Sequence, residues 1–268
     1  MDKKKRRKKS WDELTICDDF IFAKLMREEA ICKEVIELLL DVKVNKIEYV
    51  EYQKTIDISY EAKSVRLDVY TQDDNRIFNL EMQLDNHKDL PRRSRYYQAL
   101  IDLNAIEKGE YYKDLKESYV VFICTFDPFK KGLPKYEFVN TCMEEEGLQL
   151  EDGTHKVYFN AKAYRSVENQ KIQAFLRYIN GEQLEDEFVH KIEERVKRIK
   201  ENQDWRAEYM VLMTRLQDSR EEGREEGREA ERKQNIINLY HQTEDEELIF
   251  SVFDCDEVEL REILNNKK

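Results

Sequence analysis

The chain has 268 residues, 39% of them charged and 40% apolar, and its formal net charge is −12. Its 12 Phe and 15 Tyr, together with the aliphatic residues, suffice for a real hydrophobic core, which excludes a wholly disordered protein. Because acids outnumber bases 58 to 46, the surface as a whole repels polyanions, and any contact with nucleic acid must be local.

The signals of several other protein classes are missing from the sequence. No stretch approaches the roughly 20 apolar residues of a membrane helix, so we expect no membrane partner. The five cysteines are odd in number and include no CxxC pair, which predicts a reducing, cytoplasmic setting without a zinc cage. No glycine-rich phosphate loop or dinucleotide motif is present, so we expect no nucleotide cofactor.

The chain begins with a basic segment. Lys3 to Lys9 are seven consecutive cations, and no apolar run follows them, so we expect no signal peptide. Two interpretations remain open for residues 1–10: a solvated, disordered tail, or a tail that contacts nucleic acid.

The first elements alternate between helical and extended patterns. Apolar residues recur at helical spacing from Asp18 to Leu40, after an Asp cap, which predicts one core-packing helix. Residues 47–60 are rich in β-branched and aromatic side chains. Residues 65–71 and 76–84 read as two strands joined by a polar QDDN turn, which predicts a hairpin.

The next elements indicate the fold class. Residues 90–109 form an amphipathic pattern that begins with Pro91 and ends at a glycine, which predicts a helix. Residues 118–126 are almost wholly apolar, as in a strand whose two faces are both covered, and shorter strands are expected at 136–140 and 155–160. The pattern predicts an α/β core with a central mixed sheet flanked by helices.

From Val167 onward the sequence predicts long charged helices. Residues 220–231 read REEGREEGREAE, whose Glu and Arg support a solvated helix, whereas Gly223 and Gly227 each cost it about 1 kcal/mol. We expect an exposed, pliable connector here. The last segment has two short amphipathic stretches, which fit a small helical hairpin or an oligomer contact.

We therefore expect four segments. They are a basic disordered tail at 1–10, a core at 11–180, a charged helical extension at 181–232 and a small helical C-terminal segment at 233–268.

The hairpin carries the candidate chemistry. Side chains on a strand alternate between faces, so Asn79, Glu81 and Gln83 share the face opposite Leu80 and Met82. If Asp73 and Asp74 form a tight turn, the numbers of two residues that lie opposite each other on the two strands add up to 147. Asp68 then lies opposite Asn79 and diagonal to Glu81, roughly 7 to 8 Å apart at the backbone.

Two carboxylates on one sheet face repel each other unless they share a cation or a proton. A hard divalent ion with oxygen ligands, Mg²⁺ or Mn²⁺, resolves this repulsion at Asp68 and Glu81, and it can activate a water for phosphodiester hydrolysis. The alternative is an ordinary polar outer face, in which the acids pair with Arg66 and need no metal.

The surrounding sequence favours the first interpretation. The blocks RLDVY (66–70), FNLEMQ (78–83), RRSRYYQALID (92–102), KGEYY (108–112) and YVVFICTFDPF (119–129) resemble the PD-(D/E)XK nuclease family transposases, which include the recombination-promoting nucleases (Rpn). The resemblance extends through EFVNTC, LEDG and VYFNA to the glutamate-arginine-glycine repeat, over roughly residues 18–232.

This resemblance implies a restriction-endonuclease-like core, Mg-dependent DNA endonuclease activity and catalytic positions at Asp68, Glu81 and Gln83. The general motif has Lys where Gln83 stands. A Lys can offset negative charge on the scissile phosphate, whereas Gln makes only neutral hydrogen bonds, so we expect low activity.

Four further residues are candidates for the site. The DFIF segment places Asp19 where the superfamily often has another acid, although an N-cap role fits equally well. Arg92, Arg95 and Tyr96 could bind a phosphate, because Arg forms forked contacts with phosphate oxygens. The alternative for these three is a solvated helix face with the tyrosine packed on the sheet.

The leading hypothesis is a DNA endonuclease of recombination or mobile-element type that cuts through a metal-activated water. The second is a catalytically inactive nuclease-fold protein that acts as a DNA-binding or self-associating module. In that case its charged C-terminal helices would drive formation of a homo-oligomer.

Overall fold

The computed structural model describes residues 9–49, 55–56, 65–66, 69–86, 88–106 and 109–265. The chain divides into two compact units, Met1–Trp205 and Arg206–Lys268. The division into four segments, with a core at 11–180, stays a prediction.

The first unit is built on a mixed sheet. Within the described residues it has six strands, in the order β1 (Glu48–Tyr49), β4 (Val69–Gln72), β5 (Arg76–Gln83), β6 (Glu117–Cys124), β8 (Thr154–Asn160) and β7 (Lys135–Phe138). Strands β5, β6 and β8 are parallel. On one side, β4 pairs antiparallel with β5 and β1 pairs antiparallel with β4, and on the other side β7 pairs antiparallel with β8. A separate pair joins β2 (Thr55–Ile56) to β3 (Val65–Arg66).

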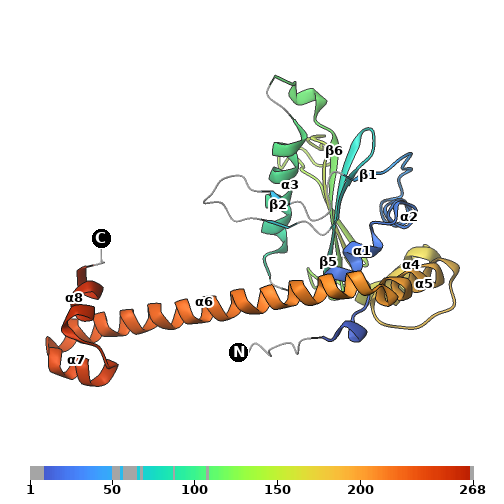
Figure 1. Cartoon of the computed structure of the whole chain (residues 1–268). Coiled ribbons are helices and arrows are strands. Elements are labelled where there is room, and N and C mark those ends of the chain that lie inside the picture. Colours follow the sequence, from blue (N-terminus) through green and yellow to red (C-terminus); the bar gives the residue numbers. More distant parts are fainter. Residues whose placement is uncertain are drawn as a thin grey trace. The chain divides into compact units, whose positions relative to one another are not determined.

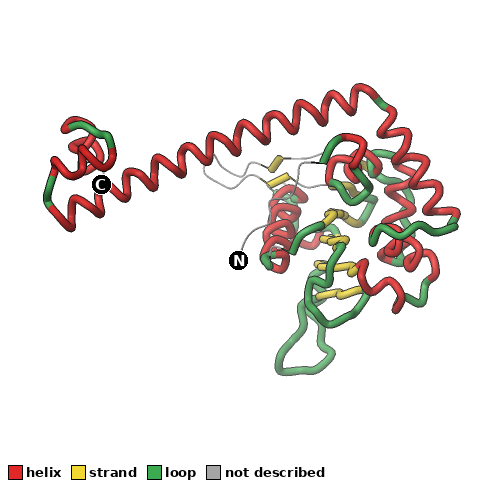
Figure 2. The backbone as a smooth tube through the Cα atoms, turned by 90° about the horizontal axis from the view of Figure 1, so that it is seen from below, coloured by secondary structure: helices red, strands yellow, loops and turns green. Residues whose placement is uncertain are grey.

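Helices cover both faces of this sheet (Figures 1 and 2). Helix α3 (Leu90–Ala105) lies on one face, where Leu100 and Ile101 pack in one buried cluster with Val120 and Phe122 of β6. Helices α1 (Asp19–Leu25) and α2 (Glu29–Leu40) lie on the other face (Figure 1). Both faces of β6 are therefore covered, as its apolar run predicted, and the predicted α/β, restriction-endonuclease-like fold is confirmed.

Further helices complete the first unit. They are η1 (Trp11–Glu13), η2 (Tyr112–Asp114), η3 (Ala161–Ser166), α4 (Gln170–Ile179) and α5 (Glu187–Glu201). Helix α5 contacts both α1 and α4. The indole nitrogen of Trp11 donates to the carbonyl of Lys200 at 2.9 Å, which fixes the N-terminal segment to the end of α5.

The prediction of one helix from Asp18 to Leu40 was wrong, because the segment forms two helices. Glu28 has extended backbone angles (φ −79°, ψ 106°), which a continuous helix cannot contain. Each part buries its own apolar face, including Phe22 in α1 and Val35 in α2, so the periodicity alone did not reveal the break.

The later elements match their predictions well. Strand β6 corresponds to the strand predicted at 118–126 but ends at Cys124, while β7 and β8 correspond to the strands expected at 136–140 and 155–160. Helix α3 begins as predicted, and the helix ends at Ala105 rather than at the glycine.

The hairpin of β4 and β5 exists, but the predicted register was wrong. Val69 pairs with Leu80 and Tyr70 with Asn79, so paired numbers sum to 149 rather than 147. The reason is the turn. The Asp73 carboxylate accepts the backbone N–H groups of Asn75 and Arg76, which moves the turn centre one residue along the chain.

The second unit contains the part of α6 (Gln203–Thr243) beyond residue 205, α7 (Glu246–Phe253) and α8 (Glu257–Asn265). The near-repeat at 220–231 lies within α6, and its glycines have open space around them. Ile236, Ile249 and Leu260 form the centre of a small core that joins the three helices. No helix among the described residues is long and apolar enough to cross a membrane.

Candidate active site

Three polar side chains of β5 are buried at the sheet face beneath α3. Asn79, Glu81 and Gln83 alternate with Leu80 and Met82, and they are only 0%, 1% and 8% exposed. They do not belong to a solvated outer face. A carboxylate at such a position requires a compensating partner, because burial of a lone charge is costly.

That partner comes from α3. Nη2 of Arg93 lies 3.6 Å from Oε2 of Glu81, and Nη1 of the same guanidinium donates to Oε1 of Gln83 at 2.9 Å. One cation thus contacts both described positions of the strand motif. The side-chain oxygen of Gln83 accepts this hydrogen bond from Arg93, so the side-chain amide nitrogen of Gln83 is the end that can donate to another group.

Arg93 is itself held in place by the helix that carries it. Its Nε and Nη2 atoms donate to the hydroxyl of Tyr97, at 3.2 and 2.6 Å, and its guanidinium lies over the rings of Tyr97 and Phe122. Burial alone would lower the pKa of Arg93, but Tyr97 and Glu81 raise it above its ordinary value. The guanidinium is therefore a fixed positive charge at this site.

Asn79 is an unusual member of the group. Its side chain is fully buried, yet neither its amide oxygen nor its amide nitrogen has a hydrogen-bond partner among the described residues. Buried polar atoms are nearly always paired in native proteins, so an orphaned amide beside a carboxylate indicates a group that the protein binds there.

The donors present fit a hard divalent cation. Glu81 offers a carboxylate and Asn79 offers an unpartnered amide oxygen on the same sheet face, and Mg²⁺ and Mn²⁺ prefer oxygen ligands. The described part of the chain contains no group of three His, Cys, Asp or Glu side chains that could hold a metal ion, so among these residues Glu81 is the one carboxylate of the site.

The other residues predicted from the sequence lie in different places. Asp68 falls outside the described residues, directly before Val69, whose partner Leu80 is the neighbour of Glu81. Arg92 and Arg95 are exposed on α3, and Tyr96 packs partly against the core cluster beneath the helix. Asp19 is exposed in the first turn of α1.

Sequence reasoning missed Arg93. The apolar stripe of α3 runs through Leu90, Tyr97, Leu100 and Ile101, and position 93 falls on that stripe at helical spacing. This periodicity was the signal that could have separated Arg93 from its neighbours.

Cys124 lies at this end of the sheet with its side chain fully buried. Cys124 pairs with Gln83 across β5 and β6, and burial raises the pKa of its thiol to about 12. A thiol with that pKa carries almost no thiolate at neutral pH, so it is not a nucleophile.

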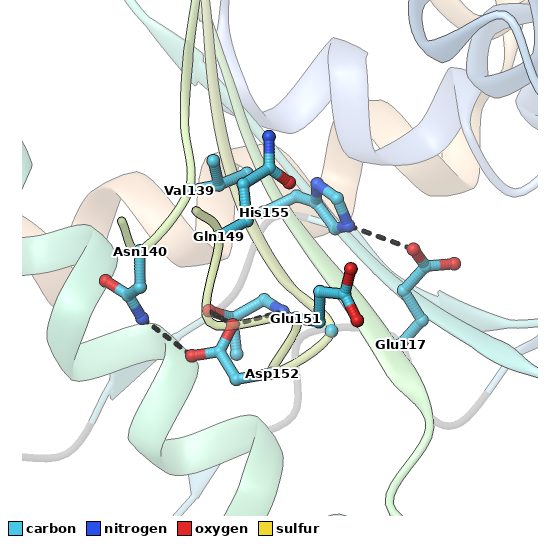
Figure 3. A pocket seen from close by; sticks show the side chains of 9 residues that line it. Glu117, Val139, Asn140, Gln149, Glu151, Asp152 and His155 are labelled. Carbon is cyan, nitrogen blue, oxygen red and sulfur yellow. Dashed lines mark hydrogen bonds and ion pairs between the residues drawn. The ribbon is translucent and has the colours of Figure 1, made fainter. Parts of the chain in front are cut away.

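A second polar pocket lies where β6 and β8 begin, at the opposite edge of the parallel strands (Figure 3). Its volume is about 240 Å³. Nε2 of His155 lies 2.9 Å from Glu117, its Nδ1 lies 3.4 Å from Glu137, and Asn140 donates to Asp152 at 2.6 Å. These carboxylates are partly exposed and each has a partner, so the pocket lacks the deep burial and the unpartnered amide that mark the site around Glu81.

Comparison with known proteins agrees with the geometry at β5. The model of the family described as PD-(D/E)XK nuclease family transposase matches residues 17–226, which include the hairpin, α3, β6 and β8. Searches among curated proteins and among solved structures found no match. The chain belongs to the PD-(D/E)XK nuclease family transposases.

Proposed function

We propose that the protein is a metal-dependent DNA endonuclease of the recombination-promoting type. The observation that carries this proposal is the group on β5. Glu81 is a buried carboxylate, its neighbour Asn79 has no hydrogen-bond partner among the described residues, and Arg93 supplies a cation within reach. Membership of the nuclease family supports DNA as the substrate.

The proposed metal ligands are Asp68 and Glu81, with the amide oxygen of Asn79 as a third donor. The assignment of Asp68 rests on the sequence motif, and that of Glu81 and Asn79 on their burial and chemistry. When bound there, Mg²⁺ or Mn²⁺ would lower the pKa of a water and offset charge on the phosphodiester.

Besides its contact with Glu81, Arg93 has a proposed role in catalysis, which follows from the presence of glutamine at position 83. A lysine at position 83 would offer a positive charge to the scissile phosphate, and Gln83 cannot. Arg93 lies 2.9 Å from Gln83 and remains charged, so we infer that the cation of this site comes from α3 instead of β5. A guanidinium also binds phosphate oxygens in a forked geometry.

The positive charge around this end of the sheet is local, as an acidic protein that binds DNA requires. Arg92 and Arg95 are exposed on the same helix as Arg93, and Lys88 and Lys130 lie in the loops beyond β5 and β6. These four side chains are the proposed contacts to the DNA backbone, although the net charge of the chain is −12.

A cleavage assay tests the proposed activity. The full chain is incubated with supercoiled plasmid in Mg²⁺ or Mn²⁺, beside Asp68→Ala and Glu81→Gln variants purified in the same way. Nicking by the wild type alone is the expected result. Equal nicking by all three proteins would assign the activity to a contaminant and overturn the proposal.

A specific observation also favours a catalytically silent protein. Arg93 already engages Glu81 and Gln83, which is how a site that has lost its metal would be neutralised. Isothermal titration with Mn²⁺ separates the two cases. Binding that disappears in Glu81→Ala supports the nuclease, whereas no binding to the wild type supports the silent interaction module.

We also propose self-association through the C-terminal helices. Leu248 and Val252 of α7 and Val258 of α8 are exposed apolar side chains, at 40%, 57% and 66% exposure. Light scattering of the wild type and a Val252→Glu/Val258→Glu variant tests this. A wild-type monomer would contradict it.

We also propose a cytoplasmic location. All five cysteines are free, which is in keeping with the reducing conditions of that compartment.

A further inference from the structure

A cavity distinct from the pocket around His155 opens beyond the ends of β5 and β6, at the same edge of the sheet as Glu81 and Gln83. Its volume is about 250 Å³. Leu90 and Pro91 from the first turn of α3, together with Pro128 and Phe129 from the loop after β6, give it apolar walls. Lys88 and Lys130 line it as well.

The cavity is tied directly to the proposed active site. Gln83 is the last residue of β5, and its carbonyl oxygen accepts the backbone N–H of Thr125 at 3.0 Å. The hydroxyl of Thr125 also donates to the carbonyl of Leu84 at 3.2 Å. The two loops that form the cavity therefore leave the sheet together, immediately after the strand positions of the motif.

The cavity is lined by two lysines. Neither Lys88 nor Lys130 forms an ion pair with an acid in the described part of the chain. Helix α3, which has 16 residues, starts at the cavity wall with Leu90, so the positive end of its dipole adds to the two ammonium groups. An anionic group is the natural complement of this arrangement.

The loops are held in shape without a ligand. The carboxylate of Asp127 accepts the backbone N–H groups of Phe129, Lys130 and Gly132, and Asn86 accepts the backbone N–H of Lys88. Phe129 also packs edge-on against Tyr158, with ring centroids 5.0 Å apart, while its own ring is only partly buried. The cavity is thus preformed, which lowers the entropic cost of binding.

An aromatic wall, other apolar walls and two cations without acidic partners match the two halves of one nucleotide. A base can pack against Phe129 and the prolines, and its phosphate can pair with the lysines. Drug-sized ligands occupy clefts of roughly 300 to 1,000 Å³, so a smaller cavity suits a single ring system and not a stacked base pair.

We propose that this cavity binds one unpaired nucleotide of the DNA strand, with its base against Phe129 and its phosphate between Lys88 and Lys130. The inference rests on the proposed nuclease function and deepens it. The strand at the active site must then be single-stranded or locally opened at this nucleotide, which makes single-stranded or frayed DNA the preferred substrate.

Fluorescence anisotropy with the full chain tests this proposal. Labelled oligo(dT) and a duplex of equal length are titrated in EDTA, which prevents cleavage, at several salt concentrations. We expect tighter binding of the single strand. Phe129→Leu, which keeps an apolar side chain but removes the ring, should weaken that binding about fivefold or more.

Lys88→Glu/Lys130→Glu should also weaken single-strand binding and flatten the slope of log affinity against log salt by about 0.7, the value for one lost phosphate contact. The matched control is Lys43→Glu/Lys113→Glu. It makes the same charge change in the segments that precede β1 and β6, at the opposite edge of the parallel strands. We expect this control to keep both the salt slope and the preference for single strands.

The outcomes separate the two proposals. If the wild type cuts plasmid but binds duplex as tightly as single strands, the nucleotide pocket is overturned and the nuclease function stands. The same conclusion follows if the pocket variants bind like the control. If the wild type binds neither form of DNA at low salt, both proposals fail.

Because Phe129 packs on Tyr158, thermal unfolding of each variant is measured beside its binding. A loss of binding by Phe129→Leu counts only if its melting temperature stays near that of the wild type. The double lysine variant, whose side chains have no acidic partner in the described residues, provides the independent readout.

Discussion

The two edges of the parallel strands both carry carboxylates, but in different states. At the edge where β6 and β8 begin, Glu117 and Glu137 are partly exposed and flank the imidazole of His155. At the edge where β5 ends, Glu81 is 1% exposed and shares one guanidinium with Gln83, while the amide of Asn79 has no hydrogen-bond partner in the described part of the chain.

The difference shows that the number of acids does not identify a reactive site. Partly exposed acids with partners contribute little to stability, and water already satisfies the rest of their polar atoms. A buried acid beside an unsatisfied amide costs the fold free energy, and proteins tolerate such costs mainly at functional sites. The combination of a buried carboxylate and an unsatisfied amide therefore points to β5.

The largest expected effect comes from Glu81. Glu81→Gln removes the buried charge but keeps the size of the side chain, and we expect DNA cleavage to fall at least about 100-fold. Glu117→Gln makes the same change at the other edge, and its cleavage rate should stay within about twofold of the wild type. Equal losses in the two variants would mean that the edges do not differ in function.

The next effect tests where the cation of the site comes from. Arg93→Met should lower the cleavage rate about 10- to 100-fold, because Arg93 is the fixed positive charge that contacts Gln83 among the described residues. Adding Gln83→Lys to this variant returns an ammonium group from the strand. The double variant should recover at least part of the lost activity.

The controls for this exchange are Arg93→Lys and Gln83→Lys alone. Arg93→Lys keeps the charge and should retain more activity than Arg93→Met, although it loses the forked contact to Tyr97. If Gln83→Lys fails to improve the Arg93→Met protein while both remain folded, Arg93 has only a structural role.

Part of the geometry of this candidate site could be predicted from the sequence. Alternation along β5 placed Glu81 and Gln83 on one face, and the long apolar run of β6 indicated a strand covered on both sides. Both inferences depend on local periodicity, which a strand imposes regardless of its neighbours.

The parts that the sequence did not reveal depend on specific contacts. The hairpin register was wrong because the Asp73 carboxylate, rather than the residue types of the turn, sets the turn centre. The exposed Arg92 and Arg95 were chosen instead of Arg93, although the apolar stripe of α3 places position 93 on the side that faces the sheet. Periodicity gives that side, but it does not identify Glu81 as the partner of Arg93.

A third prediction concerns the cost of the orphaned amide. Asn79→Leu removes two buried polar atoms that lack partners among the described residues, so the metal-free protein should become more stable by about 1 kcal/mol. The same change should weaken Mn²⁺ binding about tenfold or more, as loss of a supporting ligand does at other metal sites. Urea unfolding and isothermal titration measure the two effects.

The matched control for the Asn79 test is Ser118, a buried polar residue at the other edge. Its hydroxyl oxygen accepts a hydrogen bond from the side-chain amide of Gln98 at 2.6 Å, so Ser118→Ala should destabilise the protein instead. Destabilisation by Asn79→Leu with unchanged Mn²⁺ affinity would contradict the proposed role of the amide.

The smallest effect concerns the exposed edge and its dependence on pH. Burial alone would raise the pKa of Glu137, but Lys135 and His155 lower it below its ordinary value of 4.5. The carboxylate therefore adds stability above pH 4.5, and this contribution is lost as the pH falls through its folded pKa. Because both side chains of the Lys135–Glu137 pair are more than one third exposed, Lys135→Met should cost at most about 0.5 kcal/mol at pH 7.

Urea unfolding at pH 7 and pH 3 measures this difference, with Lys131→Met as the control for loss of one exposed lysine. The cost of Lys135→Met should be smaller at pH 3 than at pH 7, because protonation of Glu137 at low pH weakens the ion pair, and the control should show no such change. A cost that stays the same at both pH values would show that Lys135 acts through packing. The contrast between the solvated edge and the edge where β5 ends would then rest on Glu81, Asn79 and Arg93 alone.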